Sequence, residues 1–284
     1  MSLLAVRGLT KRFGGLVATD HLDLDVARDE LRAVIGPNGA GKTTLIAQLA
    51  GTLASDAGTI SMDGIDITRR SAHARVAHGI ARSYQVTNVF RHFTALDNAA
   101  LAVQACAGSS FRFFRPARRE QALFDEAQTL LARVGLHDRA HVPAGALAHG
   151  EQRQLEVALA LASRPSLLLL DEPMAGMGPD ESERMVTLIA GLKGSITIVL
   201  VEHDMDAVFR LADRISVLVY GRVLATGTPA EIRTNADVRQ AYLQRVVKAG
   251  RQGAIVNLAS TLGVTAAPNR PAYTASKHAV VGLT

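Results

Sequence analysis

Apolar and polar residues alternate along the first stretch of the chain. In Leu3–Leu9 and again in His21–Val26, the apolar residues fall on one face at a period of two, as in a strand with one buried face. The Gly14–Gly15 pair between these stretches is typical of a turn. This pattern predicts an antiparallel β layer at the N-terminus.

The pattern then changes to buried strands and a helix. Leu31–Gly36 is a short apolar run that leads into a glycine-rich loop, and Thr44–Gly51 has helical character and ends at its glycine. Two later apolar runs, Leu167–Pro173 and Ile196–Asp204, are bounded by turn or charged residues. Such runs are expected for the central strands of a parallel sheet.

Helices are predicted between these runs, from about residue 91 to residue 147. Apolar residues recur there at helical spacing and a glycine follows them: Leu123, Ala127, Leu130, Leu131, Val134 and Gly135. Further along, Thr228, Pro229 and Glu231 form the capping pattern of a helix N-terminus. The pattern breaks at about residue 248, which we interpret as the start of a separate segment.

Composition narrows the class of protein. Of the 284 residues, 48% are hydrophobic and 20% charged, which suits a sizeable core, and the net charge of +5 at pH 7 does not by itself identify a partner. Aromatic residues make up only 4% and Trp is absent, so a stacking platform for nucleic acid is not expected.

The single cysteine, Cys106, excludes an internal disulfide and suits a reducing compartment. No apolar run approaches the roughly 20 residues of a membrane span. We therefore expect a cytoplasmic protein that contacts a membrane only peripherally.

A loop after the first buried strand matches the phosphate-binding pattern G-x-x-x-x-G-K-[ST] in full. Its residues, with the threonine that follows, are Gly36, Pro37, Asn38, Gly39, Ala40, Gly41, Lys42, Thr43 and Thr44. Glycines allow successive backbone N–H groups to turn toward phosphates. In this pattern Lys42 meets the β- and γ-phosphates and the Thr43 hydroxyl ligates Mg²⁺. Because a strand precedes the loop and a helix follows it, we interpret it as a nucleotide site.

Two acidic residues, Asp171 and Glu172, end a later buried strand. A carboxylate at the tip of such a strand can reach the metal shell of a nucleotide bound nearby, and its neighbour can polarise an attacking water. Together with the complete phosphate loop, this pair predicts nucleotide hydrolysis.

Four segments, in this order and spacing, resemble the nucleotide-binding subunit of an ABC transporter. They are Gly36–Thr44, Leu147–Arg153, Leu167–Pro173 and Leu200–Asp204. The resemblance covers about residues 1–247. It implies an α/β fold with a P-loop NTPase (RecA-like) core, an antiparallel β layer and a helical subdomain over about residues 91–162. It also implies a head-to-tail dimer that holds two ATP molecules with Mg²⁺ and acts on transmembrane permease subunits at the inner face of the cell membrane.

The resemblance assigns further residues to this site. Gln85 stands at the position of a glutamine that contacts Mg²⁺ and the attacking water, and Phe13 at that of an aromatic residue that stacks on adenine. Glu172 corresponds to the general base, while His203 and Lys42 stabilise charge on the γ-phosphate. Asp171, Thr43 and Gln85 form the metal set. The signature residues, which meet the partner subunit's ATP, are Leu147, Ala148, Gly150 and Glu151.

Two departures from the family pattern concern the rate of hydrolysis. The signature usually reads LSGGQ, whereas Ala148 replaces the serine whose hydroxyl meets the γ-phosphate. The segment Met174–Asp180 also lacks the usual aspartate. We expect ATP binding to persist, because a helix N-terminus by itself attracts phosphate.

Several segments resemble, more narrowly, one ATPase subunit of branched-chain amino-acid importers. They are Leu147–Arg153, Glu172–Pro179, Val201–Phe209 and Gly227–Leu243. Such importers also use a periplasmic binding protein, and the second ATPase can be the same chain or a homologue. Related urea or amide importers remain an alternative. A soluble ABC-type ATPase of DNA repair or translation is a further one, although such proteins usually carry paired nucleotide domains or long coiled-coil inserts.

The last part of the chain resembles the catalytic stretch of a short-chain dehydrogenase/reductase. Ser260, Tyr273 and Lys277 have the spacing of that family's catalytic set, and Asn257 matches its asparagine. The glycine-rich nicotinamide turn that this enzyme needs upstream is missing. We therefore interpret residues 248–284 as a linker and an incomplete Rossmann fragment. A bifunctional oxidoreductase remains the alternative.

Overall fold

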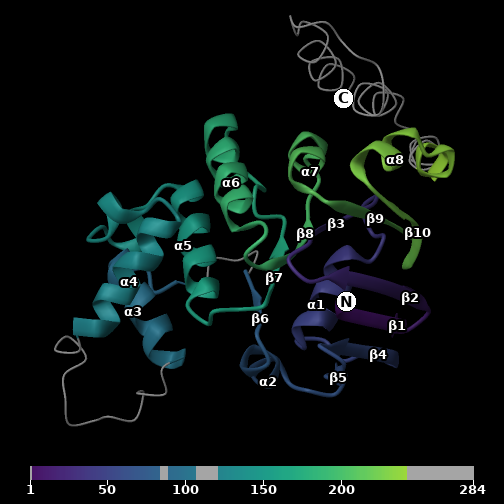
Figure 1. Ribbon diagram of the computed structural model, residues 1–284, viewed down its shortest axis with the longest axis horizontal. Coiled ribbons are helices and arrows are strands. Elements are labelled where there is room, and N and C mark those ends of the chain that lie inside the picture. The colour runs from purple at the N-terminus through teal and green to yellow at the C-terminus, as the bar shows by residue number, and fades with distance from the viewer. Residues whose placement is uncertain (1, 84–88, 107–120, 242–284) are drawn as a thin grey trace, which may run out of the picture.

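The computed structural model describes residues 2–83, 89–106 and 121–241, which form an α/β structure with two sheets (Figure 1). The larger sheet has six strands, of which all but one edge strand run parallel. In spatial order they are β10 (Arg222–Gly227), β9 (Arg214–Val219), β3 (Leu31–Ile35), β8 (Thr197–Val201), β7 (Leu167–Asp171) and β6 (Ile80–Arg82). β3, β7 and β8 are buried at every position, so the prediction of central parallel strands is confirmed.

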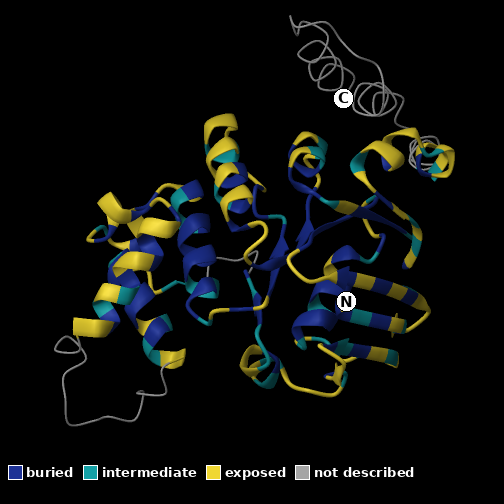
Figure 2. Ribbon diagram, viewed as in Figure 1, coloured by how far each residue is buried: buried dark blue, intermediate teal, exposed yellow. Residues whose placement is uncertain are grey.

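The smaller sheet is the antiparallel layer that the alternating N-terminal pattern predicts. Its strands, in spatial order, are β2 (Leu16–Ala27), β1 (Ser2–Phe13), β4 (Ala57–Met62) and β5 (Ile65–Asp66). Figure 2 shows the alternation of buried and exposed positions along β1 and β2. Gly14, in the turn between them, has a φ of +57°, a backbone conformation that glycine adopts at little cost.

Helix α1 (Lys42–Ala50) packs between the two sheets. Its residues Leu45, Ile46 and Leu49 are fully buried in one cluster with residues of the antiparallel layer and of the central strands. The C-terminal carbonyls of α1 are held by Arg75 from the short helix α2 (Ala72–Ala77), whose guanidinium donates to Gln48 O at 2.6 Å and to Leu49 O at 2.8 Å.

The opposite face of the central sheet shares a second core cluster with further helices, some of which lie beside the sheet and not over it (Figure 1). They are α3 (Ala95–Cys106), α4 (Gln121–Arg133), α5 (His149–Leu161), α6 (Pro179–Leu192) and α7 (Met205–Leu211). α3, α4 and α5 pack on one another to one side of the sheet (Figure 1). This confirms the helical expectation for the described part of the middle of the chain, whereas residues 107–120 lie outside the described residues. Among the described residues, none of the helices is both long and apolar enough to cross a membrane.

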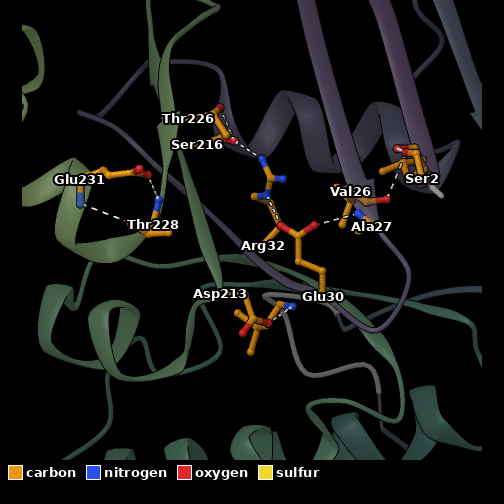
Figure 3. Close-up of polar contacts among 12 residues, drawn as sticks. Ser2, Val26, Ala27, Glu30, Arg32, Asp213, Ser216, Thr226, Thr228 and Glu231 are labelled. Atoms are coloured by element: carbon orange, nitrogen blue, oxygen red, sulfur yellow. Dashed lines mark hydrogen bonds and ion pairs between the residues drawn. The ribbon is translucent and has the colours of Figure 1, made fainter.

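A buried polar network ties the edge of the antiparallel layer to the central sheet (Figure 3). Glu30 accepts the Ala27 N–H at 2.7 Å and pairs with Arg32 at 2.6 Å, and Arg32 donates to the Ser216 hydroxyl at 2.9 Å. Because both charged side chains are buried, each needs the other to avoid a large desolvation cost.

The predicted capping pattern is present at the start of α8 (Pro229–Thr234), which is also drawn in Figure 3. The Thr228 N–H donates to the Glu231 carboxylate at 2.7 Å, and the Glu231 N–H donates to the Thr228 hydroxyl at 3.4 Å. These reciprocal bonds satisfy two backbone donors that the helix leaves open.

Candidate nucleotide site

The candidate site lies at the carboxyl edge of the central sheet. Parallel strands end at the same edge, and ligands of open α/β sheets bind there. β3 ends in the phosphate loop, β7 in Asp171 and Glu172, and β8 in Glu202 and His203. Segments that lie far apart in the sequence are thereby brought to one edge.

The phosphate loop requires glycine at Gly36 and Gly41, because backbone oxygens of other segments lie where a Cβ would be. A Cβ on Gly36 would lie 2.2 Å from Leu218 O, and one on Gly41 would lie 2.2 Å from Ala18 O. Gly41 has a φ of +102° and immediately precedes α1, whose first turn carries no acidic side chain. The N-terminus of α1 is therefore available to attract an anion.

The polar side chains of the loop sit at this helix N-terminus. Lys42 is buried, and its Nζ donates to Gly36 O at 2.7 Å and to Pro37 O at 3.2 Å, so the ammonium is held inside the loop. The Thr43 side chain is exposed and that of Thr44 is half-buried. Asn38 and Gly39 are exposed at the tip of the loop, while Ala40 is buried beneath it.

Asp171 is buried at the tip of β7, with only 1% of its surface exposed. Its Oδ2 pairs with the Arg82 guanidinium at 3.0 Å, while its Oδ1 is buried without a hydrogen-bond partner. Burial raises the pKa of the Asp171 carboxyl, although Arg82 opposes the shift. Arg82 carries no local signal in the sequence that marks it as a site residue. Its pairing with Asp171 becomes apparent only once β6, which ends at Arg82, is known to lie beside β7 in the sheet.

Glu172 and His203 meet directly, with the imidazole Nε2 2.7 Å from Glu172 Oε1. Glu172 adopts a φ of +52°, which is uncommon for a residue with a side chain and typical of functional sites. Its N–H donates to Val201 O at 2.8 Å, so the turn after β7 is fixed to the end of β8. The two residues expected to act on the γ-phosphate are therefore brought together.

Glu202 is a further residue that the sequence analysis did not single out, although it lies inside the quoted segment Leu200–Asp204. It is buried, and its carboxylate accepts backbone N–H groups of Met174 and His203, each at 2.8 Å. Burial raises the pKa of Glu202, and these N–H donors oppose that rise.

The signature segment leads into α5, a different element from the one that follows the phosphate loop. Leu147 is buried, whereas Ala148 is exposed. Glu151 accepts the Ala148 N–H at 2.9 Å and pairs with Arg139 at 2.8 Å. Burial alone would raise the pKa of Glu151, but these two partners outweigh it and lower the pKa.

Gly150, also in the signature segment, is buried, and its N–H donates to Glu181 Oε1 at 3.2 Å. Glu181 lies in the first turn of α6, and its other oxygen accepts the Gly178 N–H at 3.2 Å. The signature segment is thus joined to the segment that follows Glu172.

Phe13 lies at the end of β1 and is 49% exposed, so its ring is open to contact. Lys11 Nζ lies 5.6 Å from the centroid of that ring. Gln85 lies outside the described residues, as do Asn257, Ser260, Tyr273 and Lys277.

The residues present fit a magnesium nucleotide. Oxygen donors suit Mg²⁺, which usually takes one or two carboxylates together with substrate phosphates. The orphaned Asp171 Oδ1 and the exposed Thr43 are donors of this kind. Over residues 2–83, 89–106 and 121–241, no cluster of three or more His, Cys, Asp or Glu forms a metal site independent of a ligand. The edge can therefore bind a nucleoside polyphosphate beside a carboxylate–imidazole pair.

Comparison with known proteins defines the class. A family model described as "ABC transporter" matches residues 19–175. The structure resembles a nucleotide-free ATP-binding cassette from an ABC transporter, with a TM-score of 0.75 and 26% identity over 85% of this chain and 99% of that one. It also resembles the ADP conformation of such a cassette, with a TM-score of 0.76 and 26% identity over 86% and 99% of the two chains.

The chain belongs to the ABC transporter family, as an ATP-binding subunit that binds nucleotide and hydrolyses ATP in coupling to transport. It is 40% identical over 85% of its length to the "High-affinity branched-chain amino acid transport ATP-binding protein BraF" of Pseudomonas aeruginosa, and covers 97% of that protein. The same values hold for LivG of Salmonella typhimurium, which carries the same description. A model described as "Branched-chain amino acid ATP-binding cassette transporter" matches residues 222–243, and one described as "short chain dehydrogenase" matches residues 233–284.

Proposed function

We propose that the chain is the ATP-hydrolysing subunit of an importer for branched-chain amino acids. The relatives named above carry that description, and the segment from Arg222 to about residue 243 matches the corresponding model. The site residues act on the nucleotide and not on the solute, so the choice of amino acid lies with other subunits. Importers of urea or amides are the alternative that an uptake assay distinguishes.

The central observation is the Glu172–His203 contact beside a complete phosphate loop. In our proposal Glu172 accepts the proton of the attacking water, and the imidazole of His203 orients Glu172 and meets the γ-phosphate. Lys42 compensates the charge of the β- and γ-phosphates. Its Nζ donates to Gly36 O at 2.7 Å, which holds the ammonium inside the phosphate loop.

Mg²⁺ would be held by the Thr43 hydroxyl and Asp171, with Gln85 as a third group from the segment outside the described residues. The metal would supply charge neutralisation between the phosphates. The buried Asp171 Oδ1 supports this assignment, because a buried carboxylate oxygen without a partner costs free energy unless a ligand completes it. Phe13 would stack on the adenine.

A second ATP-binding subunit completes each site in this proposal. The signature residues Leu147, Ala148, Gly150 and Glu151 would meet the ATP of the partner subunit, which is the same chain or a homologue. The pair would act on transmembrane permease subunits at the inner face of the membrane, with a periplasmic binding protein delivering the solute.

We propose residues 1–247 as the nucleotide-binding unit, with its helical subdomain over about residues 91–162. Residues 248–284 would form a linker and an incomplete dehydrogenase-like fragment without hydride transfer. NAD(P)H binding, measured by fluorescence on the full chain, tests the fragment. Binding that Tyr273→Phe or Lys277→Ala weakens would favour the bifunctional alternative.

The deciding experiment measures Mg-dependent ATPase activity of the full chain and of a truncation ending at Val247, each with and without Glu172→Gln. Glu183→Gln is the matched control, because Glu183 is an exposed carboxylate that pairs with Arg210 outside the site. We expect equal activities of the full and truncated chains, loss with Glu172→Gln or a chelator, and no loss with Glu183→Gln. Activity that survives Glu172→Gln would refute the assigned base. Uptake of leucine against urea, with the permeases in vesicles, tests the solute.

A further inference from the structure

Glu202 joins two loops that carry the residues proposed to act on the γ-phosphate. Its Oε1 accepts the Met174 N–H at 2.8 Å, and its Oε2 accepts the His203 N–H at 2.8 Å and the Asp204 N–H at 3.4 Å. Met174 follows Glu172 by two residues, and His203 follows Glu202 directly. A single carboxylate therefore fixes the backbone on both sides of the Glu172–His203 contact.

The turn that carries Glu172 needs such support. A φ of +52° is strained for a residue with a side chain, and it persists only where the surroundings over-determine it. Two hydrogen bonds donated by backbone N–H groups restrain the turn, one at the glutamate itself and one two residues after it. Upstream, the Glu172 N–H is held by Val201 O at 2.8 Å, and downstream, the Met174 N–H is held by Glu202 at 2.8 Å.

Core packing does not explain a carboxylate at this position. Glu202 is 4% exposed, and burying a carboxylate costs free energy unless its hydrogen bonds compensate for it. The side-chain hydrogen bonds described for it all go to backbone N–H groups of the loops after β7 and β8. Those hydrogen bonds therefore stabilise the relative placement of the two loops.

We propose that Glu202 is a positioning residue for ATP hydrolysis, which holds the loops after β7 and β8 so that Glu172 and His203 meet at the γ-phosphate. The inference rests on the proposed roles of these two residues. Glu202 does not touch the nucleotide in this proposal, and it acts through the two side chains that do.

Glu202→Gln tests the proposal with little change in shape. The amide keeps one acceptor oxygen, but its NH₂ group faces backbone donors of the other loop, so one of the two loops is released. We expect kcat to fall roughly 10- to 100-fold, because a displacement of about 1 Å in a reacting group has effects of this size. KM for Mg-ATP should stay within about two-fold, because the phosphate loop is untouched.

Glu30→Gln is the matched control. Glu30 is also a buried carboxylate that accepts a backbone N–H, from Ala27 at 2.7 Å, but it lies at the opposite end of β3 from the phosphate loop. At temperatures where both variants are folded, Glu30→Gln should keep the wild-type kcat. Equal losses of kcat in the two variants would show a role in folding only and would overturn the proposal.

A double-mutant cycle separates positioning from general stability. If Glu202 acts through Glu172, Glu202→Gln should add little to the loss caused by Glu172→Gln, whereas independent effects would multiply.

Should Glu202→Gln not fold, Glu202→Asp is the second variant. It keeps the charge but is one methylene shorter, and it should show the same fall in kcat at constant KM. Wild-type kcat in the variant that folds would refute the positioning role. A wild-type chain whose activity does not depend on Glu172 would instead refute the proposed catalytic roles.

Discussion

Arg75 offers a stringent test of what holds the nucleotide-binding helix in place. Its side chain is 2% exposed and its guanidinium donates to four backbone carbonyls, Gln48 O at 2.6 Å, Leu49 O at 2.8 Å, Thr68 O at 2.8 Å and Arg70 O at 3.1 Å. Two of these carbonyls belong to the last turn of α1, where a positive charge also complements the helix dipole. Burial lowers the pKa of Arg75. We consider the substitution Arg75→Met, which keeps most of the apolar stem.

The expected loss of stability follows from these contacts. A hydrogen bond to a charged group contributes about 1.5–3 kcal/mol, so four of them give roughly 6–12 kcal/mol before any cost is subtracted. The burial of an ion costs several kcal/mol, and Met avoids that cost. The difference leaves a destabilisation of about 3–5 kcal/mol for Arg75→Met. In a domain of this size, that corresponds to a fall in apparent melting temperature of roughly 6–20 °C.

Thermal unfolding followed by circular dichroism, with and without Mg-ATP, measures this effect. Arg69→Met is the matched control, because Arg69 lies on the same segment but is exposed, and its melting temperature should stay within about 2 °C of the wild type. A fall of less than about 2 °C for Arg75→Met would refute the reasoning. It would mean that water replaces the guanidinium at the end of α1.

Three further outcomes are expected. Gly41→Ala should weaken binding of a fluorescent ATP analogue at least about 10-fold, because the new Cβ would lie 2.2 Å from Ala18 O at a φ of +102°; unchanged affinity would contradict the loop geometry. Thr228→Ala removes the cap of α8 and should destabilise the chain by about 1 kcal/mol, measured by denaturant unfolding, with no change in ATPase activity. A hydrogen bond from Lys11 is the main cause that lowers the pKa of Asp56. The stability that Asp56 contributes is therefore complete above the ordinary carboxyl pKa of about 4 and is lost as the pH falls through the folded pKa. Asp56→Asn should flatten this part of the curve of melting temperature against pH, and an unaltered curve would exclude the linkage.

Local patterns were sufficient to predict most of the fold and to indicate where the candidate site lies. The alternation in β1 and β2, the apolar run of β3 and the glycines of the phosphate loop each concern residues close in sequence, whose backbone conformation follows from local sterics. The capping pair Thr228 and Glu231 is three residues apart and equally local. Asp171 and Glu172 were found because a buried strand ends at them.

The side-chain partners of the site could not be predicted in this way. Arg82 and Asp171 are 89 residues apart, Met174 and Glu202 are 28 apart, and Gly150 and Glu181 are 31 apart. Each pair depends on the order of strands in the sheet or on the packing of two helices, and no local period encodes that order. The roles carried over from the family resemblance, including that of Gln85, stay predictions.

The position of β3 in the sheet has a consequence for the order of events during synthesis. β3 is made early, but hydrogen bonds at its N-terminal end connect Asp29 with Thr197 and Leu31 with Asp213, over 168 and 182 residues of sequence. Gly221 later donates its N–H to Ala40 O at 3.0 Å, beneath the phosphate loop. A nascent chain that has not yet reached β10 therefore contains the phosphate loop but lacks the Gly221 N–H that bonds to it. Contacts so distant in sequence form slowly. We expect the growing chain to acquire affinity for ATP only once the last strands of the sheet have left the ribosome.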